Sequence, residues 1–283
     1  MEILTGLIDR CIKTNNNTLP TLQSFRMSYN PADTIEGFSS PHALPLWRTG
    51  GISPLIRTNE TTTSVFSSLK HLTVDNVTHD WSLLTLSGLH TLRILNIPSH
   101  NSPSYTDLHR LLLDNAETLT TLELSNISVS DLETVGGRFT LPNVQKMTIG
   151  FAHPRDLVWA AQTLDLPALD HLILEDQAAG TGEWMSEVNK RQTVEGYQEL
   201  TRCFPLSRVR RLVLRYVVFY KLPQPVEHIH GESEQTFAVR FLSNFKEVKA
   251  LEVSAPDFSL SEVLETFSYV LFPNLRSYYL ERA

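Results

Sequence analysis

A nine-residue motif recurs along the chain, with apolar residues at its first, fourth, seventh and ninth places. Because 41% of the residues are hydrophobic, such a pattern arises by accident about eight times in a chain of this length. The spacing of the copies is therefore more informative than their number. The copies are LPTLQSFRM (19–27), FSSLKHLTV (66–74), LHTLRILNI (89–97), AETLTTLEL (116–124), LPNVQKMTI (141–149), LPALDHLIL (166–174), LSRVRRLVL (206–214), FKEVKALEV (245–253) and FPNLRSYYL (272–280).

The spacing of these copies matches that of a leucine-rich repeat. Successive copies begin 47, 23, 27, 25, 25, 40, 39 and 27 residues apart, and five of these steps fall within the repeat length of about 20 to 29 residues. Pro20, Pro142, Pro167 and Pro273 stand at the second place of their copies, where proline ends a preceding helix and favours an extended chain. The pattern predicts a short strand in each copy.

Segments with a helical period lie between these strands. Ser104 with Asp107 and Ser259 with Glu262 have the spacing of a helix N-cap. Strand and helix therefore alternate, which predicts an α/β fold, a leucine-rich-repeat solenoid with a curved parallel β-sheet and helices on its convex side. The apolar helix stripes are Leu108, Leu111 and Leu112; Leu157, Ala160, Ala161 and Leu164, behind Pro154; and Val263, Leu264, Phe267, Val270 and Leu271.

We expect one leucine-rich-repeat domain over residues 1–283. Residues 28–65 hold four prolines and a glycine pair and predict an irregular or degenerate repeat. Insertions at 176–204 and 218–244 account for the steps of 40 and 39 residues, and each is expected to contain a helix, the second built on Phe237, Phe241 and Phe245. The last motif predicts an open edge strand, and hence a truncated product or self-association through residues 275–281.

Composition argues against several classes of function. The net charge is −7 and Lys and Arg are scattered along the sequence, so we expect neither nucleic acid nor a membrane as a partner. Two cysteines, Cys11 and Cys203, are too few for a disulfide framework and lack a zinc spacing. Glu2 and Asp9 interrupt the N-terminal apolar stretch, which is not typical of a signal peptide. The expected location is the cytoplasm or the nucleus.

The sequence patterns do not point to catalysis. His228 and His230 flank Ile229 without a third metal ligand at suitable spacing. The segment GTGEW at Gly180 lacks the Gly-Lys-Ser/Thr of a phosphate-binding loop. We therefore expect no enzyme activity, cofactor or metal. Trp47, in the proline-rich stretch, is a candidate exposed anchor for a partner.

Alternation along each strand predicts a partner-binding face. The eighth place of each motif, and the residue after the ninth, point away from the core onto the concave side. Acidic residues in the middle of this row precede two arginines and a second acidic group, which suits a protein of complementary charge. The alternative is a solvated face whose charges only maintain solubility. The candidate residues are Arg26, Thr73, Asp75, Asn96, Glu123, Thr148, Glu175, Arg215, Glu252 and Tyr279, with Arg211 at a sixth place.

The chain resembles the leucine-rich-repeat region of fungal F-box proteins. The resemblance covers residues 66–283 and is carried by THDWSLLTLSGLHTLRILNI (78–97) and HPRDLVWAAQTLDLPALDHLIL (153–174). In that family the repeats capture a protein to be ubiquitylated, and a separate N-terminal F-box recruits the ligase adaptor. The resemblance implies substrate recognition in a ubiquitin ligase. The F-box opening Leu-Pro-x-Glu-(Ile/Leu) is missing here, so the adaptor is an expected partner only if an F-box lies outside this sequence.

Two other roles remain open, an interaction scaffold with no ubiquitin role and an enzyme regulator such as a GTPase activator of the same fold. The common repeat signature has Asn or Cys three residues after the motif, and in this sequence only Asn30 fits it. We therefore expect no asparagine ladder. The residues found there include Val77, Ile127, Ala152 and Val217.

Overall fold

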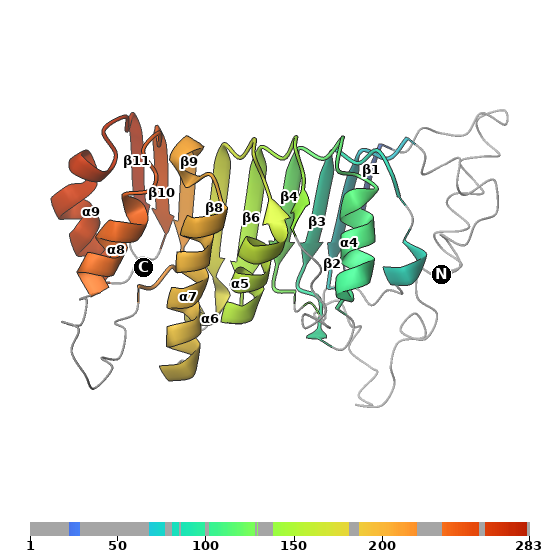
Figure 1. Cartoon of the computed structure of the whole chain (residues 1–283), viewed down its shortest axis with the longest axis horizontal. Helices are drawn as coiled ribbons and strands as arrows, with labels where there is room; N and C mark the ends of the chain where they lie inside the picture. Colours follow the sequence, from blue (N-terminus) through green and yellow to red (C-terminus); the bar gives the residue numbers. More distant parts are fainter. Residues whose placement is uncertain are drawn as a thin grey trace, which may run out of the picture. The chain divides into compact units, whose positions relative to one another are not determined.

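The chain has an α/β fold of parallel strands and helices (Figure 1). The structure, a computed structural model, describes residues 23–28, 68–76, 81–84, 86–99, 102–127, 129, 138–180, 187–219, 234–254 and 258–281. It divides into two compact units, unit 1 with residues 1–119 and 127–131 and unit 2 with residues 120–126 and 132–283. Residues 29–65, which include Trp47, and the pair His228 and His230 lie outside the described residues.

In unit 1, three strands pair in parallel and in chain order, β1 (Ser24–Ser28), β2 (His71–Asp75) and β3 (Thr91–Leu95). The short 3-10 helix η3 (Trp81–Leu83) and α4 (Tyr105–Leu113) follow β2 and β3. The N-cap predicted for α4 is confirmed, because the backbone N–H of Asp107 donates to Ser104 Oγ at 3.1 Å. The buried side chains include Leu72, Val74, Leu92 and Ile94 from the strands and Leu108, Leu111 and Leu112 from α4.

In unit 2, six strands pair in parallel, and their order in space is their order along the chain. They are β4 (Thr121–Ser125), β6 (Lys146–Phe151), β8 (His171–Asp176), β9 (Arg211–Arg215), β10 (Ala250–Ser254) and β11 (Ser277–Glu281). Two further short strands, β5 (Phe139–Thr140) and β7 (Leu164–Asp165), form a separate parallel pair.

The longer helices of unit 2 lie on one face of its strands and leave the other face uncovered (Figure 1). The helix α7 lies in the first of the two long segments expected to contain a helix, and α8 in the second. The N-cap predicted at Ser259 is wrong, because α9 begins one residue earlier. The helices are α5 (Pro154–Thr163), α6 (Gln177–Gly180), α7 (Glu187–Cys203), η6 (Leu206–Arg208), α8 (Glu234–Leu242) and α9 (Phe258–Leu271).

The stripe predicted along α9 is only partly buried. Val263 and Leu264 are buried, whereas Phe267 is 42% and Val270 78% exposed. Periodicity places apolar residues on one side of a helix, but it does not set how much of that side the neighbouring elements cover. The prediction of a helix is therefore confirmed, and part of its apolar stripe is exposed in the described residues.

An aromatic cluster joins β6, α7 and α8 within the core of unit 2. Tyr197 of α7 is fully buried, and its ring centroid lies 5.2 Å from that of Phe241, 5.4 Å from Phe219, 6.2 Å from Phe151 and 6.5 Å from Phe237. The tilted and edge-on arrangements are those that aromatic rings prefer. The helix expected on three phenylalanines contains only two, because Phe245 follows the end of α8.

Each of the nine motifs contains a strand, but the predicted position of the third motif differs by three residues from the position that its strand requires. In the other eight copies the strand begins at the sixth place, whereas β3 begins at the third place of LHTLRILNI. Backbone pairing aligns Leu72 with Leu92 and Val74 with Ile94. The motif is therefore LSGLHTLRI (86–94), and Leu95 and Ile97 imitate its last two apolar places. Correcting the register changes the two adjoining steps to 20 and 30 residues.

One backbone pattern marks where the strands of unit 2 that follow β4 begin. The carbonyl oxygen of the residue before a strand accepts two successive N–H groups from the start of the next strand. Asp170 O accepts from Arg210 N at 2.8 Å and from Arg211 N at 3.1 Å. The same pattern recurs at the carbonyls of Gln145, Arg210 and Lys249. Residues that precede neighbouring strands therefore lie side by side along one edge.

The residue after four of the strands has a left-handed backbone conformation. Its φ is 52° at Asn76 and Asn96, 51° at Asn126 and 55° at Tyr216. Asparagine tolerates this conformation better than most residues, whereas a bulky side chain is strained there. An asparagine thus recurs in the repeat, although not at the place that the common signature predicts. At that place Ile127 and Val217 are buried apolar residues.

We expect Tyr216→Asn to raise the free energy of unfolding by about 1 kcal/mol, because it relieves a left-handed tyrosine that is itself 41% exposed. The reverse change, Asn126→Tyr, should lower it by a similar amount. Chemical denaturation of both variants measures the two effects. Equal and opposite shifts support backbone strain as the cause, and a loss of stability in Tyr216→Asn contradicts it.

Candidate functional site

The face of unit 2 opposite its longer helices carries three rows of side chains, one for each outward position of its strands. The short helix α6 touches one end of this face, where Gln177 Nε2 donates to Ser125 Oγ at 2.8 Å. Residues in one row are partners in the parallel register, so they lie on neighbouring strands. We call this surface the sheet face of unit 2. The first row contains Lys146, His171 and Arg211; the second Glu123, Thr148, Ile173, Val213, Glu252 and Tyr279; the third Ser125, Gly150, Glu175, Arg215, Ser254 and Glu281.

Ion pairs connect the charged side chains of this face across three strands. Arg215 Nη1 lies 3.6 Å from Glu175 Oε2, and Arg215 Nη2 lies 3.9 Å from Glu252 Oε1. Glu252 Oε2 is in turn 3.7 Å from Arg211 Nη2. These side chains are partly exposed, and such pairs each contribute about 1 kcal/mol or less to stability. A partner with charged groups can therefore replace them at small cost.

Beneath the charges, the middle of the sheet face is buried and mostly apolar. Thr148 is 3%, Ile173 7% and Val213 2% exposed, although all three point away from the helices. Val213 lies between Arg211 and Arg215 on β9, and both arginines reach across to Glu252. The aliphatic parts of the two arginines therefore cover Val213. The face combines a buried apolar centre with charged groups of both signs above it.

Unit 1 carries a smaller polar group of the same kind. Arg26 Nη2 lies 3.4 Å from Asp75 Oδ2, and Asn96 Nδ2 donates to Asp75 Oδ1 at 3.0 Å. Thr73 is half-buried on the same face of β2. The sequence predicted that Asn96 is a strand residue, and this is wrong because the predicted register of the third motif is wrong. Asn96 follows β3, and Arg93 takes the expected place beside Thr73.

The other predicted residues of unit 2 lie on the sheet face as expected. Arg211, Arg215, Glu175 and Glu252 come together in one network. Glu123 is half-buried on β4, and Tyr279 is 57% exposed on β11, away from that network. Their positions follow from strand alternation, which confirms the face but not its use. Partner binding stays a prediction for all of them.

His171 is a residue of the first row that the sequence analysis missed. Burial, followed by the positive charges of Lys146 and Arg211, lowers the pKa of its imidazole to about 4. Its Nε2 atom is buried and has no hydrogen-bond partner among the described residues. The sequence could have indicated it, because His171 occupies the sixth place of its motif, as Arg211 does. This row therefore presents cations beside an unused imidazole nitrogen.

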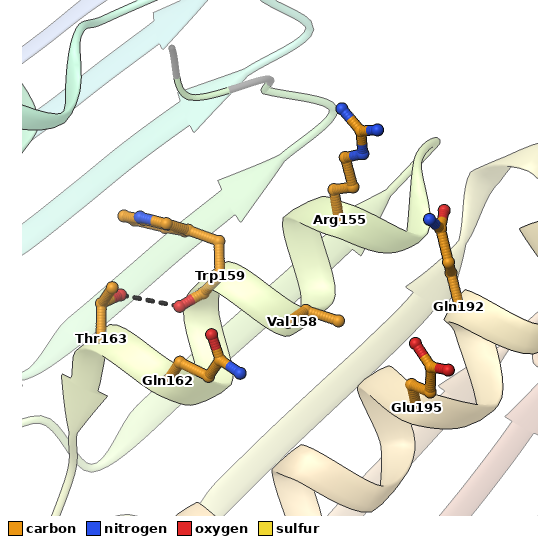
Figure 2. A pocket seen from close by; sticks show the side chains of 7 residues that line it. All are labelled: Arg155, Val158, Trp159, Gln162, Thr163, Gln192 and Glu195. Carbon is orange, nitrogen blue, oxygen red and sulfur yellow. Dashed lines mark hydrogen bonds between the residues drawn. The ribbon is translucent and has the colours of Figure 1, made fainter. Parts of the chain in front are cut away.

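A hollow of about 270 Å³ lies on the opposite, helical side of unit 2, between α5 and α7. Figure 2 shows Val158 and Gln162 of α5 directed toward Glu195 of α7, with Arg155 projecting away near the start of α5. The lining residues include one hydroxyl, that of Thr163, and it donates to the carbonyl oxygen of Trp159 at 2.8 Å. The hollow thus lacks an available nucleophile, and it does not indicate catalysis.

Asp156 lies in the first turn of α5. Burial raises its pKa to about 7, against a smaller opposing effect of a hydrogen bond from the backbone of His153. Because this pKa is above that of the unfolded chain, the protonated carboxyl favours folding below pH 3.8, and this contribution is lost as the pH rises through 7. The folded protein therefore loses stability over this interval through Asp156.

We expect Asp156→Asn to remove that loss. Relative to the unsubstituted chain, its free energy of unfolding should rise by about 4 kcal/mol between pH 4 and pH 8. Urea unfolding at both pH values measures the difference. The exposed residue Asp114, which follows α4, provides a control variant, Asp114→Asn. A pH-independent difference for Asp156→Asn would contradict the assigned pKa.

Within the described ranges, no group of three or more His, Cys, Asp or Glu side chains is arranged to hold a metal ion. No helix in the same ranges combines the length and apolarity needed to cross a membrane. Comparison of the chain with models of known protein families gives no match, and comparison with curated proteins gives none either. The candidate site is therefore defined by its geometry.

Proposed function

We propose that the chain is a leucine-rich-repeat solenoid that recognises a protein partner through the sheet face of unit 2. Its strands follow one another in chain order, with the connecting helices on one side, as in stacked repeats. The observation that carries the proposal is the network of Glu175, Arg215, Glu252 and Arg211 above the buried Val213. Charges of both signs at fixed positions favour specific protein recognition.

The role that best fits the sequence resemblance is substrate recognition in an F-box-type ubiquitin ligase. In that role the sheet face captures the substrate, and an F-box outside residues 1–283 recruits the adaptor. The support is the resemblance over residues 66–283. An interaction scaffold would use the same face without the adaptor. Co-purification of the adaptor with the natural full-length protein supports the ligase role, and its absence from purified complexes supports the scaffold.

Charge reversal on the sheet face tests the recognition proposal. The variants Glu123→Lys and Arg215→Glu should each weaken binding of captured partners at least tenfold, equivalent to about 1.4 kcal/mol. Glu195→Lys and Arg191→Glu provide matched controls, because both residues are exposed on α7, on the helical side. Quantitative mass spectrometry of captured proteins measures the losses. If all four variants retain the same partners, the sheet face is not the binding site.

A further inference from the structure

Basic residues gather at the edge of unit 2 where β9, β10 and β11 begin. The three segments that enter these strands, 206–211, 245–250 and 272–277, contain six Lys or Arg residues and one acidic residue, Glu247. Five of the six are exposed and Lys249 is half-buried. We call this group the basic edge. It consists of Arg208, Arg210, Arg211, Lys246, Lys249 and Arg276.

The backbone pattern at the strand starts places three of these cations next to one another. Lys249 N donates to Arg210 O at 2.8 Å, and Arg276 N donates to Lys249 O at 2.8 Å. Neighbouring strands are about 4.8 Å apart, so the three residues form a short row of like charge. The chain as a whole has a net charge of −7, and the basic edge is therefore a local reversal of its sign.

The basic edge borders a hollow of about 320 Å³. Arg208 and Arg210 line it together with Gln145, Pro167, Ala168, Leu169 and Asp170. Arg208 Nη1 donates to Pro167 O at 3.2 Å, and Arg210 Nε lies 3.3 Å from Asp170 Oδ1. Asp170 offsets part of the charge of Arg210, and Glu252 offsets part of the charge of Arg211. A partner side chain can thus enter a recess beside the cations.

The first row of the sheet face continues this positive surface. Lys146 and His171 lie on β6 and β8, in register with Arg211. A carboxylate arriving at this row would meet two cations, Lys146 and Arg211, with His171 between them. At the carboxyl ends of β8 and β11 the third row carries the carboxylates of Glu175 and Glu281. Arg215 of β9 belongs to the same row and forms an ion pair with Glu175.

We propose that the basic edge binds an acidic segment of the protein partner. From there the partner's chain crosses the sheet face, and basic residues of the partner lie near Glu175 and Glu281. This inference rests on the proposed function and specifies the charge pattern of the partner. Cations at one end of the strands and carboxylates at the other favour a segment with both signs of charge. Nucleic acid is less suitable, because its phosphates would meet the carboxylates of the sheet face and it offers no cation to them.

Binding of a fluorescein-labelled deca-glutamate peptide to the full chain tests the basic edge. By fluorescence anisotropy at low salt, Lys246→Glu/Arg276→Glu should weaken binding at least tenfold, because both residues are exposed and belong to the edge. The control Arg155→Glu/Arg191→Glu makes the same change in net charge on α5 and α7 and should weaken it less than twofold. Thermal unfolding of both double variants establishes that each is folded.

Two outcomes would overturn the inference. One is deca-glutamate that fails to bind, or that loses affinity equally in both double variants. The other is that a labelled deca-thymidylate binds as tightly as the peptide and that the edge variant loses this binding. That result would make the basic edge a nucleic-acid site. If sheet-face variants abolish partner capture while the edge variant retains it, the proposed function stands and only this inference fails.

Discussion

Replacing Asn115 by alanine is expected to lower the free energy of unfolding by about 3 kcal/mol. The side chain is 1% exposed and makes three hydrogen bonds. Its Nδ2 atom donates to Leu86 O at 2.8 Å and Leu111 O at 2.7 Å, and its Oδ1 atom accepts from Leu89 N at 2.8 Å. Alanine would leave these buried backbone groups without partners. Chemical denaturation monitored by circular dichroism measures the loss.

Asn244 provides a matched control. Like Asn115, it stands two residues after a helix and four residues before a buried apolar residue that leads into a strand. It is only half-buried, and its Nδ2 atom donates to Arg240 O at 2.8 Å and to Phe241 O at 3.0 Å. Both acceptors belong to α8, the helix that Asn244 follows. Asn244→Ala should cost about 1 kcal/mol. Equal losses in the two variants would mean that the bonds to Leu86 and Leu89 contribute little.

The aromatic cluster of unit 2 gives a larger expected effect than Asn115. Phe241→Ala should lower the free energy of unfolding by about 4 kcal/mol, because it empties a ring-sized space in a packed core. Phe241 is 2% exposed, and its ring centroid lies 5.2 Å from Tyr197, 5.6 Å from Phe219 and 5.4 Å from Phe245. Guanidinium unfolding measures the loss, and Phe241→Leu should recover part of it by refilling the space.

Phe267 on α9 is the control for this prediction. The same substitution, Phe267→Ala, should cost about 1 kcal/mol or less, because that side chain is already 42% exposed. A cost as large as that of Phe241→Ala would show that the cluster is no more important than an exposed phenylalanine. A small cost in both variants would show that the surrounding rings collapse into the vacated space.

The alternation of strand and helix could be predicted because it depends on local patterns. On β2, β4, β6, β8, β9 and β10 the apolar places of the motif are buried residues. Pro154 and Ser104 mark the starts of helices in the structure. Register depends on more than the local pattern. In the third motif, Leu95 and Ile97 offered a second set of apolar places, and only pairing with β2 shows that Leu92 and Ile94 are the inward residues.

The sequence predicted which residues of the candidate site point outward, but not which of their side chains contact one another. Strand alternation is enough to place Arg215 and Glu252 outward, but their ion pair depends on which strands are neighbours. The basic edge was missed for the same reason. Arg210, Lys249 and Arg276 are far apart along the sequence, so its charges look scattered, and the parallel ladder brings them together.

The register of β9 with its two neighbours indicates where the chain tolerates added length. The connections already vary, since α4 has nine residues and α7 has 17, while most of the paired strands keep five. Epitope tags placed in those connections would leave the ladder intact. One residue inserted between Leu212 and Val213 would instead exchange the inner and outer sides of the rest of β9, driving Arg215 into the core.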